Sequence, residues 1–157
     1  RECSKESLYN YLSFICNSCV TDKVSRYDIQ EKKVLSTFDK YYLADVSLAR
    51  IHSVKLDIGA SLENIVYNEL KSRGYEVYIG ALKNAEIDFV AQKGNEKQYF
   101  QVCYLLADEA TVEREFGAYK NVKDNYPKYV LSADKFDFSQ EGIIHKNIID
   151  WLLEPHS

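Results

Sequence analysis

The 157-residue chain contains no methionine and only two prolines, four cysteines and six glycines. Because even the first position is Arg1 rather than methionine, we expect the chain to be part of a longer protein. Four scattered cysteines are too few for a disulfide scaffold, so the expected location is the reducing cytoplasm. No apolar run approaches the roughly 20 residues that span a bilayer. No signal peptide is recognisable either, so we expect no membrane partner.

The chain also lacks an excess of positive charge. Its 20 basic and 24 acidic residues give a net charge of −4, so no global basic field attracts nucleic acid. No glycine precedes Lys-Ser or Lys-Thr, which excludes a Walker-type ATP site within this chain. With 46% hydrophobic and 28% charged residues, the composition is that of an ordinary folded domain.

The first part of the chain predicts a helix followed by a two-stranded ribbon. Helical spacing of apolar residues covers Ser4–Cys19, and strands are expected at 20–27 and 33–38, joined by a polar turn. This order is that of the second half of a winged helix. We therefore assign residues 1–56 to a partial winged-helix-like segment and linker, in which residues 41–45 form a short buried link.

Residues 57–157 predict a second unit, whose elements follow the order α-β-β-β-α-β with a closing helix. This order indicates an α/β (α+β) mixed sheet flanked by helices. Gly74 stands where a left-handed cap ends the first of these helices. Helices are expected at 61–73, 108–124 and 147–153, and strands at 75–79, 85–92, 98–106, 128–132 and 142–145.

The strand at 85–92 carries two carboxylates whose placement follows from its period of two. Alternation places Glu86 and Asp88 on one face, and it places Ile87 and Phe89 on the other. A turn at Gly94 makes the next strand a neighbour. The sequence therefore predicts that Asp88 reaches side chains of that next strand.

Three oxygen-bearing side chains are candidates for a metal site. Gln101 and Cys103 share a face of the strand at 98–106, beside Asp88, and Glu63 lies on the preceding helix at the border of its apolar stripe. Carboxylate and carboxamide oxygens suit Mg²⁺ or Mn²⁺. Glu63, Asp88 and Gln101 are thus the predicted metal ligands, and such an ion polarises a phosphate and activates a water.

The layout of these residues resembles a known nuclease superfamily. Glu63 on a helix, Glu86-Ile87-Asp88-Phe89 on a strand and Gln101-Val102-Cys103 on the next strand follow the pattern of the PD-(D/E)xK superfamily, which has the restriction-endonuclease-like fold. The chain also resembles the C-terminal region of prokaryotic AAA+-type ATPases, which carry a P-loop domain, a winged helix and a nuclease-like domain of unassigned function. The stretches that carry this resemblance include Lys40–Asp45, Gly59–Tyr78, Glu86–Val90 and Tyr99–Leu106.

The resemblance implies a restriction-endonuclease-like domain over residues 57–157, an ATPase domain upstream and DNA as a partner. The chain departs from the pattern on the third strand, where the superfamily has Asp/Glu-x-Lys and this chain has Gln101-x-Cys103. One ligand charge and one catalytic ammonium are lost. We therefore expect a relict site of Glu63, Asp88, Gln101 and Cys103, in a module that binds DNA or a partner and regulates the ATPase.

These side chains also fit ordinary structural roles and different functions. The carboxylates suit a solvated surface, and Cys103 suits a small buried hydrophobe or half of a Cys–His nucleophilic pair. An active Mg²⁺- or Mn²⁺-dependent nuclease is the main alternative function. Thirteen tyrosines favour a third, a structural or oligomerisation domain. Cys16-x-x-Cys19 has the spacing of a zinc half-site, although no second pair follows.

The ribbon provides the candidate DNA contacts. Lys23, Arg26, Lys32 and Lys33 cluster there, with tyrosines between them, and the turn of a wing lies along a DNA backbone. Acidic residues are interleaved with these cations, which is equally typical of a solvated face.

Overall fold

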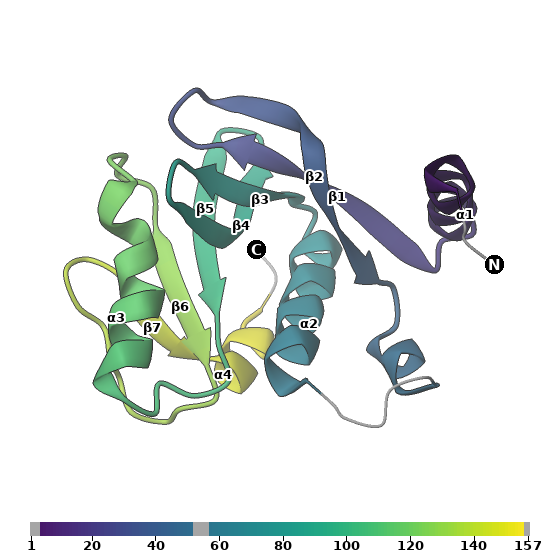
Figure 1. Ribbon diagram of the computed structural model, residues 1–157. Coiled ribbons are helices and arrows are strands. Elements are labelled where there is room, and N and C mark those ends of the chain that lie inside the picture. Colours follow the sequence, from purple (N-terminus) through teal and green to yellow (C-terminus); the bar gives the residue numbers. More distant parts are fainter. Residues whose placement is uncertain (1–3, 52–56, 156–157) are drawn as a thin grey trace.

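The computed structural model describes residues 4–51 and 57–155 of the chain, and these form one mixed β-sheet with helices on both faces (Figure 1). Seven described strands have the order β2-β1-β3-β4-β5-β6-β7, with parallel and antiparallel neighbours. The predicted mixed sheet flanked by helices is confirmed. The strands are β1 (Thr21–Asp28), β2 (Lys33–Leu43), β3 (Glu76–Leu82), β4 (Ala85–Lys93), β5 (Glu96–Val102), β6 (Lys128–Ser132) and β7 (Ile144–Asn147).

The helices divide between the two faces of the sheet. One buried cluster joins Leu70 and Trp151 to the sheet residues Phe89 and Phe100. The other joins Phe116, on the opposite face, to residues such as Ile87, Val90 and Tyr99. The helical segments are α1 (Lys5–Asn17), η1 (Val46–Ile51), α2 (Ile58–Ser72), α3 (Glu109–Gly117), η2 (Ala118–Asn121) and α4 (Ile148–Leu152).

The ribbon β1–β2 belongs to the same sheet as the rest of the chain. β1 pairs antiparallel with β2 and parallel with β3, where Arg26 stands opposite Ile79. The sheet therefore runs across the predicted boundary between residues 56 and 57. β2 also continues to Leu43, so most of the residues predicted to form a link are strand residues. Tyr42 explains this extension, because it is buried and its ring stacks on Tyr67 with 4.6 Å between the centroids.

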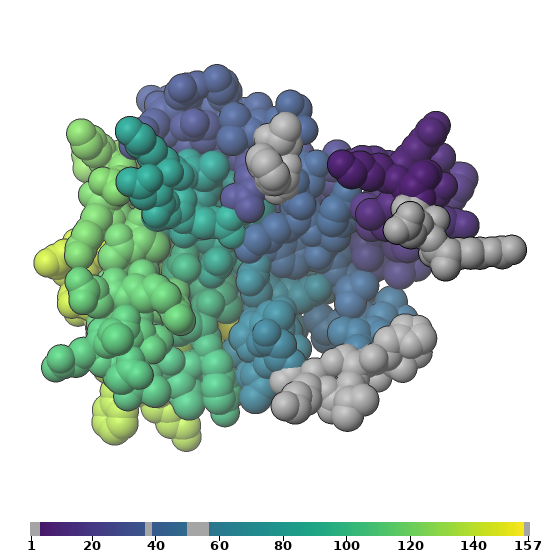
Figure 2. Space-filling model, viewed as in Figure 1, coloured from purple at the N-terminus to yellow at the C-terminus, as the bar shows by residue number. Residues whose placement is uncertain are grey.

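α1 projects from the body of the molecule at the end of the ribbon (Figures 1 and 2). Its start follows the prediction, since Ser4 Oγ accepts a hydrogen bond from the Ser7 amide at 3.1 Å. It ends at Asn17, two residues early, because Cys19 has a positive φ of 59° that a helix does not allow. None of its residues is buried, so the apolar residues whose spacing predicts the helix do not form a buried face.

α2 is the helix that carries Glu63. It begins before the predicted start because Asp57 is the N-cap, and its carboxylate accepts a hydrogen bond from the Ala60 amide at 3.1 Å. The helix ends as predicted near Gly74, which has a φ of 83°. No described helix in the structure has the length and apolar character needed to cross a membrane.

Candidate functional site: a charged cleft at the end of the β4–β5 pair

The candidate site lies where the backbone ladder between β4 and β5 ends. The last paired residues are Phe89 and Phe100. Beyond them the Asp88 amide donates to Gln101 Oε1 at 3.2 Å, and the Val102 amide donates to Asp88 Oδ2 at 2.8 Å. Side chains thus replace the backbone partners that the ladder would supply. This replacement brings Asp88 and Gln101 together, as the sequence predicts.

A bulge in β4 sets the direction of Asp88. Tyr78 of β3 stands opposite Val90 and Gly80 opposite Ile87, so one residue of β3 faces two residues of β4, Asp88 and Phe89. Bulges of this kind redirect side chains, often beside functional sites. The predicted sharing of a face by Ile87 and Phe89 is wrong for this reason, since the two pack on opposite sides of the sheet.

Gly80 lies next to the bulge, opposite Ile87, and permits close packing there. A Cβ atom there would lie 2.8 Å from the Cβ of Ile87, a separation that real Cβ atoms do not show. The backbone of β3 therefore approaches β4 more closely than any larger residue would allow.

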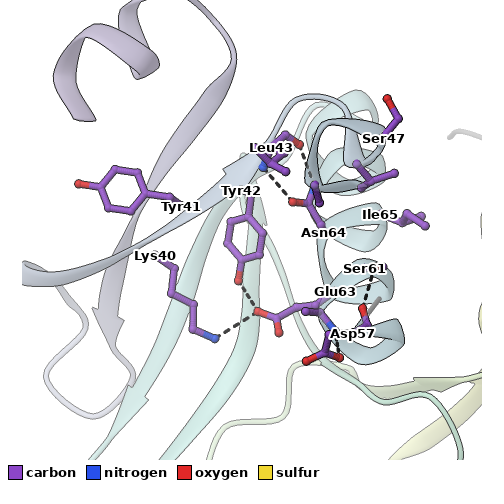
Figure 3. A pocket seen from close by; sticks show the side chains of 13 residues that line it. Lys40, Tyr41, Tyr42, Leu43, Ser47, Asp57, Ser61, Glu63, Asn64 and Ile65 are labelled. Atoms are coloured by element: carbon purple, nitrogen blue, oxygen red, sulfur yellow. Dashed lines mark hydrogen bonds and ion pairs between the residues drawn. The ribbon is translucent and has the colours of Figure 1, made fainter. Parts of the chain in front are cut away.

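Glu63 projects from α2 toward the end of β2, where two donors meet it (Figure 3). Its Oε1 accepts hydrogen bonds from the Tyr42 hydroxyl at 2.5 Å and from Lys40 Nζ at 3.1 Å. Lys40 Nζ also lies 2.8 Å from Oε1 of Glu86, whose other oxygen pairs with the Arg26 guanidinium. Lys40 therefore bridges carboxylates of α2 and β4.

Glu63 and Glu86 border an open cleft of about 1180 Å³ between α2, the ends of β4 and β5, and α3. All four residues of the predicted relict site line this cleft. A second hollow, of about 710 Å³, lies between β2, η1 and α2 and shares Glu63 with the cleft (Figure 3). The polar lining of the cleft includes Glu63, Glu86, Asp88, Gln101, Cys103, Arg114 and Glu115.

Asp88 is the carboxyl group whose ionisation is most unfavourable. Burial and the nearby charge of Glu63 raise its pKa to about 7, although the Val102 amide and Lys40 act in the opposite direction. Its Oδ2 is bonded to the Val102 amide, and its Oδ1 has no hydrogen-bond partner among the described residues. At neutral pH the carboxyl of Asp88 is therefore divided between its neutral and ionised forms.

The neighbouring carboxylate of Glu86 behaves in the opposite way. Burial by itself would raise its pKa, but the hydrogen bonds and charges of Lys40 and Arg26 outweigh this and hold the pKa below its usual value. Despite its burial, the pKa of Lys40 is raised by its contacts with Glu86 and Glu63. The bridge between Lys40 and Glu86 is thus fully charged at neutral pH.

Cys103 does not have the features of a nucleophile. Burial, followed by the charge of Glu115, raises the pKa of its thiol to about 12, so the thiol is neutral at pH 7. His145, the one histidine in the described part of the chain, contacts Ser132 Oγ at 2.8 Å and the Phe138 amide at 3.3 Å. The structure does not place it as the partner of Cys103.

The Cys16–Cys19 pair shows no further metal ligands. Cys16 Sγ lies 3.6 Å from Thr21 Oγ1, and Cys19 is exposed. Among the residues that the structure describes, no three His, Cys, Asp or Glu side chains form a cluster able to hold a metal ion. His52 and His156 lie outside the described residues.

The predicted DNA-binding cations are spread along the ribbon, and three of them pair with acidic side chains. Lys23 Nζ lies 2.9 Å from Asp39 Oδ2, and Lys33 pairs with Glu31. Arg26 pairs with Glu86, which lines the cleft. Lys32 lies in the turn with a φ of 54°. The structure therefore does not gather these four residues into one basic patch.

Two of the predicted metal ligands, Glu63 and Gln101, each have an oxygen engaged with donors of the protein itself. Glu63 accepts from Tyr42 and Lys40, and Gln101 Oε1 accepts from the Asp88 amide. Mg²⁺ and Mn²⁺ require such oxygens to point at the ion instead. The donor set in this arrangement does not fit a divalent ion.

The sequence does not predict Glu115 of the cleft or Lys40 beside it. The one sequence signal for Lys40 is that it begins the stretch Lys40–Asp45, which carries part of the family resemblance. Glu115 is almost fully buried and pairs with the exposed Arg114, with 2.6 Å between Oε1 and Nη2. An acidic residue on a predicted helix gives no indication of this burial.

The comparisons with known proteins find relatives without a described activity. The chain is 34% identical over 154 residues to an uncharacterized protein of Haemophilus influenzae, covering 96% of this chain and 38% of the relative. It is 32% identical over 126 residues to an uncharacterized protein of Methanocaldococcus jannaschii, covering 77% of this chain and 28% of the relative. The chain thus spans well under half the length of either. No family model matches the chain, and no solved structure matches it.

Proposed function

We propose that this chain is a restriction-endonuclease-like module of a prokaryotic AAA+-type ATPase, that it no longer cleaves phosphodiesters, and that it regulates the ATPase by binding a partner. One observation carries the proposal: Oε1 of Glu63 and Oε1 of Gln101, two of the oxygens that would bind a metal ion, are hydrogen-bonded to the protein's own donors. The attached ATPase domain comes into the proposal from the sequence resemblance alone.

The chemistry of the third strand supports the loss of cleavage. Metal-dependent phosphodiester hydrolysis needs an activated water and positive charge near the developing negative charge. Gln101 supplies a neutral carboxamide in place of a carboxylate, and Cys103 supplies a neutral thiol in place of an ammonium. This strand therefore retains neither the charged metal ligand nor the ammonium group of the superfamily pattern.

The charge distribution favours a protein partner over DNA. Carboxylates dominate the charged lining of the cleft, and phosphates would be repelled there. The ribbon lysines Lys23 and Lys33 are paired with acidic side chains, which weakens their attraction for a DNA backbone. A partner that presents basic side chains is the better match.

Plasmid DNA incubated with Mn²⁺ tests the loss of cleavage. We expect no nicking or linearisation by the wild-type chain, and no difference between it and Asp88→Asn. Asp150→Asn is the matched control, because this exposed residue of α4 does not line the cleft. Cleavage that disappears in Asp88→Asn and persists in Asp150→Asn would contradict the proposal.

An active nuclease is the second candidate, and one observation favours it. Asp88 Oδ1 is without a hydrogen-bond partner among the described residues, and Lys40 of another strand contacts Glu63 and Glu86 at the edge of the cleft. In this alternative Lys40 would replace the missing lysine of the third strand. The plasmid assay separates the two candidates directly.

A structural or oligomerisation role is favoured by α1. Its large apolar side chains are more than half exposed at Leu8 (54%) and Phe14 (67%). Light scattering coupled to size-exclusion chromatography tests this role. Stable self-association that Phe14→Ser abolishes, without any binding activity, would support it over the regulatory module.

A further inference from the structure

We propose that Lys40 is a built-in cation beside the cleft, whose ammonium group holds the cleft residues Glu63 and Glu86 together and neutralises their charge as a divalent ion would. The inference rests on the proposed function and deepens it, because it names the group that neutralises the carboxylates when no metal ion is bound. It also gives the ribbon a direct role in the site, since Lys40 lies on β2.

The contacts of Lys40 are those of a bridging cation. Its Nζ lies 3.1 Å from Glu63 Oε1 and 2.8 Å from Glu86 Oε1, so one charge is shared between two carboxylates of different elements. All three side chains are about a quarter to a third exposed, which limits the screening of these charges by water. Arg26 contacts the second oxygen of Glu86 and adds a second positive charge to the group.

The position of Lys40 is fixed by contacts of the β2 residues that follow it. The Asn64 carboxamide accepts from the Leu43 amide and donates to the Leu43 carbonyl, both at 2.8 Å, and so fastens the end of β2 to α2. Tyr42 is buried, stacks on Tyr67 and donates to Glu63. The Lys40 ammonium is therefore held near the carboxylates before any ligand arrives.

A metal ion would have to displace this ammonium. With Lys40 in place, Glu63 and Glu86 already have a counter-charge, and a second cation nearby is repelled. Without Lys40, the three carboxylates of Glu63, Glu86 and Asp88 would remain in the cleft, and Arg26 would offset only part of their charge. The neutral variant Lys40→Met should therefore bind a divalent ion that the wild-type chain binds weakly.

Calorimetric titration of the 157-residue chain with Mn²⁺ tests this directly. We expect Lys40→Met to bind Mn²⁺ at least tenfold more tightly than the wild type, and to gain thermal stability from Mn²⁺ that the wild type does not gain. Lys40→Arg retains the charge and should behave as the wild type. Lys33→Met removes a ribbon cation that pairs outside the cleft, and it serves as the matched control.

The site of any gained binding is then checked with a second substitution. Adding Asp88→Asn to Lys40→Met should abolish the gain. If Lys40→Met fails to fold by circular dichroism, Lys40→Gln keeps a donor without the charge and replaces it in the titration. The inference is overturned if neither neutral variant binds Mn²⁺ more tightly than the wild type, or if Lys33→Met gains as much.

The plasmid assay keeps this inference distinct from the proposed function. A wild-type chain that cleaves DNA through Asp88 overturns the proposed function whatever the titration shows. A cleavage activity that Lys40→Met abolishes would make Lys40 a catalytic cation, and it would overturn the metal-replacing role too. Absence of cleavage together with no gain of Mn²⁺ binding overturns only the role of Lys40.

Discussion

The strand pair β4–β5 brings polar side chains into the cleft, and the ribbon β1–β2 brings cations to the carboxylates at its edge, but the two sets of side chains are held differently. Asp88 and Gln101 are held by hydrogen bonds to backbone amides of neighbouring strand residues. Lys40 and Arg26 are held by carboxylates that lie more than 20 residues away in the sequence. The first arrangement follows from local strand pairing, whereas the second requires the ribbon to join the sheet. The cleft is therefore a shared product of two segments that the sequence presents as separate.

The largest expected effect compares the core beneath α2 with the outlying helix α1. Leu70→Ala removes a fully buried side chain, and we expect the free energy of unfolding to fall by roughly 2–5 kcal/mol. Leu8→Ala removes a side chain that is 54% exposed, and it should change this free energy by no more than about 0.5 kcal/mol. Denaturation in urea measures both. A large effect of Leu8→Ala would show that α1 packs against something in solution.

The next effect concerns the strand-held residue Asp88. Its pKa in the folded protein is about 7, above the ordinary value of 3.8, so folding becomes less favourable as the pH rises from about 4 to 7. Asp88→Asn cannot ionise and keeps an acceptor for the Val102 amide. We expect it to be more stable than the wild type by roughly 1–3 kcal/mol at pH 8.

The same two proteins should have nearly equal stability at pH 4, where the wild-type carboxyl is neutral when folded. Urea denaturation at pH 4, 6 and 8 checks this trend. A constant difference across the three pH values would mean that Asp88 is not held in an unfavourable ionisation state.

Tyr42→Phe tests a contact between the ribbon and α2. It removes the hydroxyl that donates to Glu63 and leaves the stacked ring, so we expect a loss of about 1–2 kcal/mol. Tyr67→Phe is the matched control, since its hydroxyl donates to the exposed Asp22 at 2.9 Å. We expect the control to lose about half as much or less. Equal losses would indicate that the Tyr42–Glu63 hydrogen bond stabilises the fold no more than the Tyr67–Asp22 hydrogen bond does.

The smallest effect concerns His145 on β7, two strands away from β5. Burial lowers its pKa below 6.5, against the opposing charges of Asp134 and Asp137, and its Nδ1 accepts from the Phe138 amide. A protonated ring loses that acceptor. We expect stability to fall by about 1 kcal/mol or less as the pH drops from 7 to 5, and His145→Gln to remove that dependence. Thermal melts across this pH range provide the measurement.

The sequence predicts some elements well because their signals are local. Gly74 marks the end of α2, where only a positive φ is needed, and β6 lies at the predicted residues. Period-two alternation fails within β4 because the bulge adds one residue at Asp88 and Phe89. Nothing in the residues of β4 alone indicates a bulge, since it depends on pairing with β3 beside Gly80.

For the candidate site, the sequence predicts which residues neighbour Asp88, but it does not predict the hydrogen bonds that they make. The turn at Gly94 makes β4 and β5 adjacent, and this adjacency places Asp88 beside Gln101. Whether Gln101 points to a metal ion or to the Asp88 amide depends on where the backbone ladder ends. Lys40 was not predicted as a site residue because no periodicity relates β2 to α2 and β4.

By itself, the sequence determined the mixed α/β sheet, the order of its elements and the identities of the carboxylates on α2 and β4. These properties follow from local hydrophobic spacing and turn chemistry, which act over a few residues. Only the tertiary structure decided that β1 joins β3, and that Lys40 lies between Glu63 and Glu86. Such contacts join residues distant in the chain, and they form only when the buried side chains of both segments pack together.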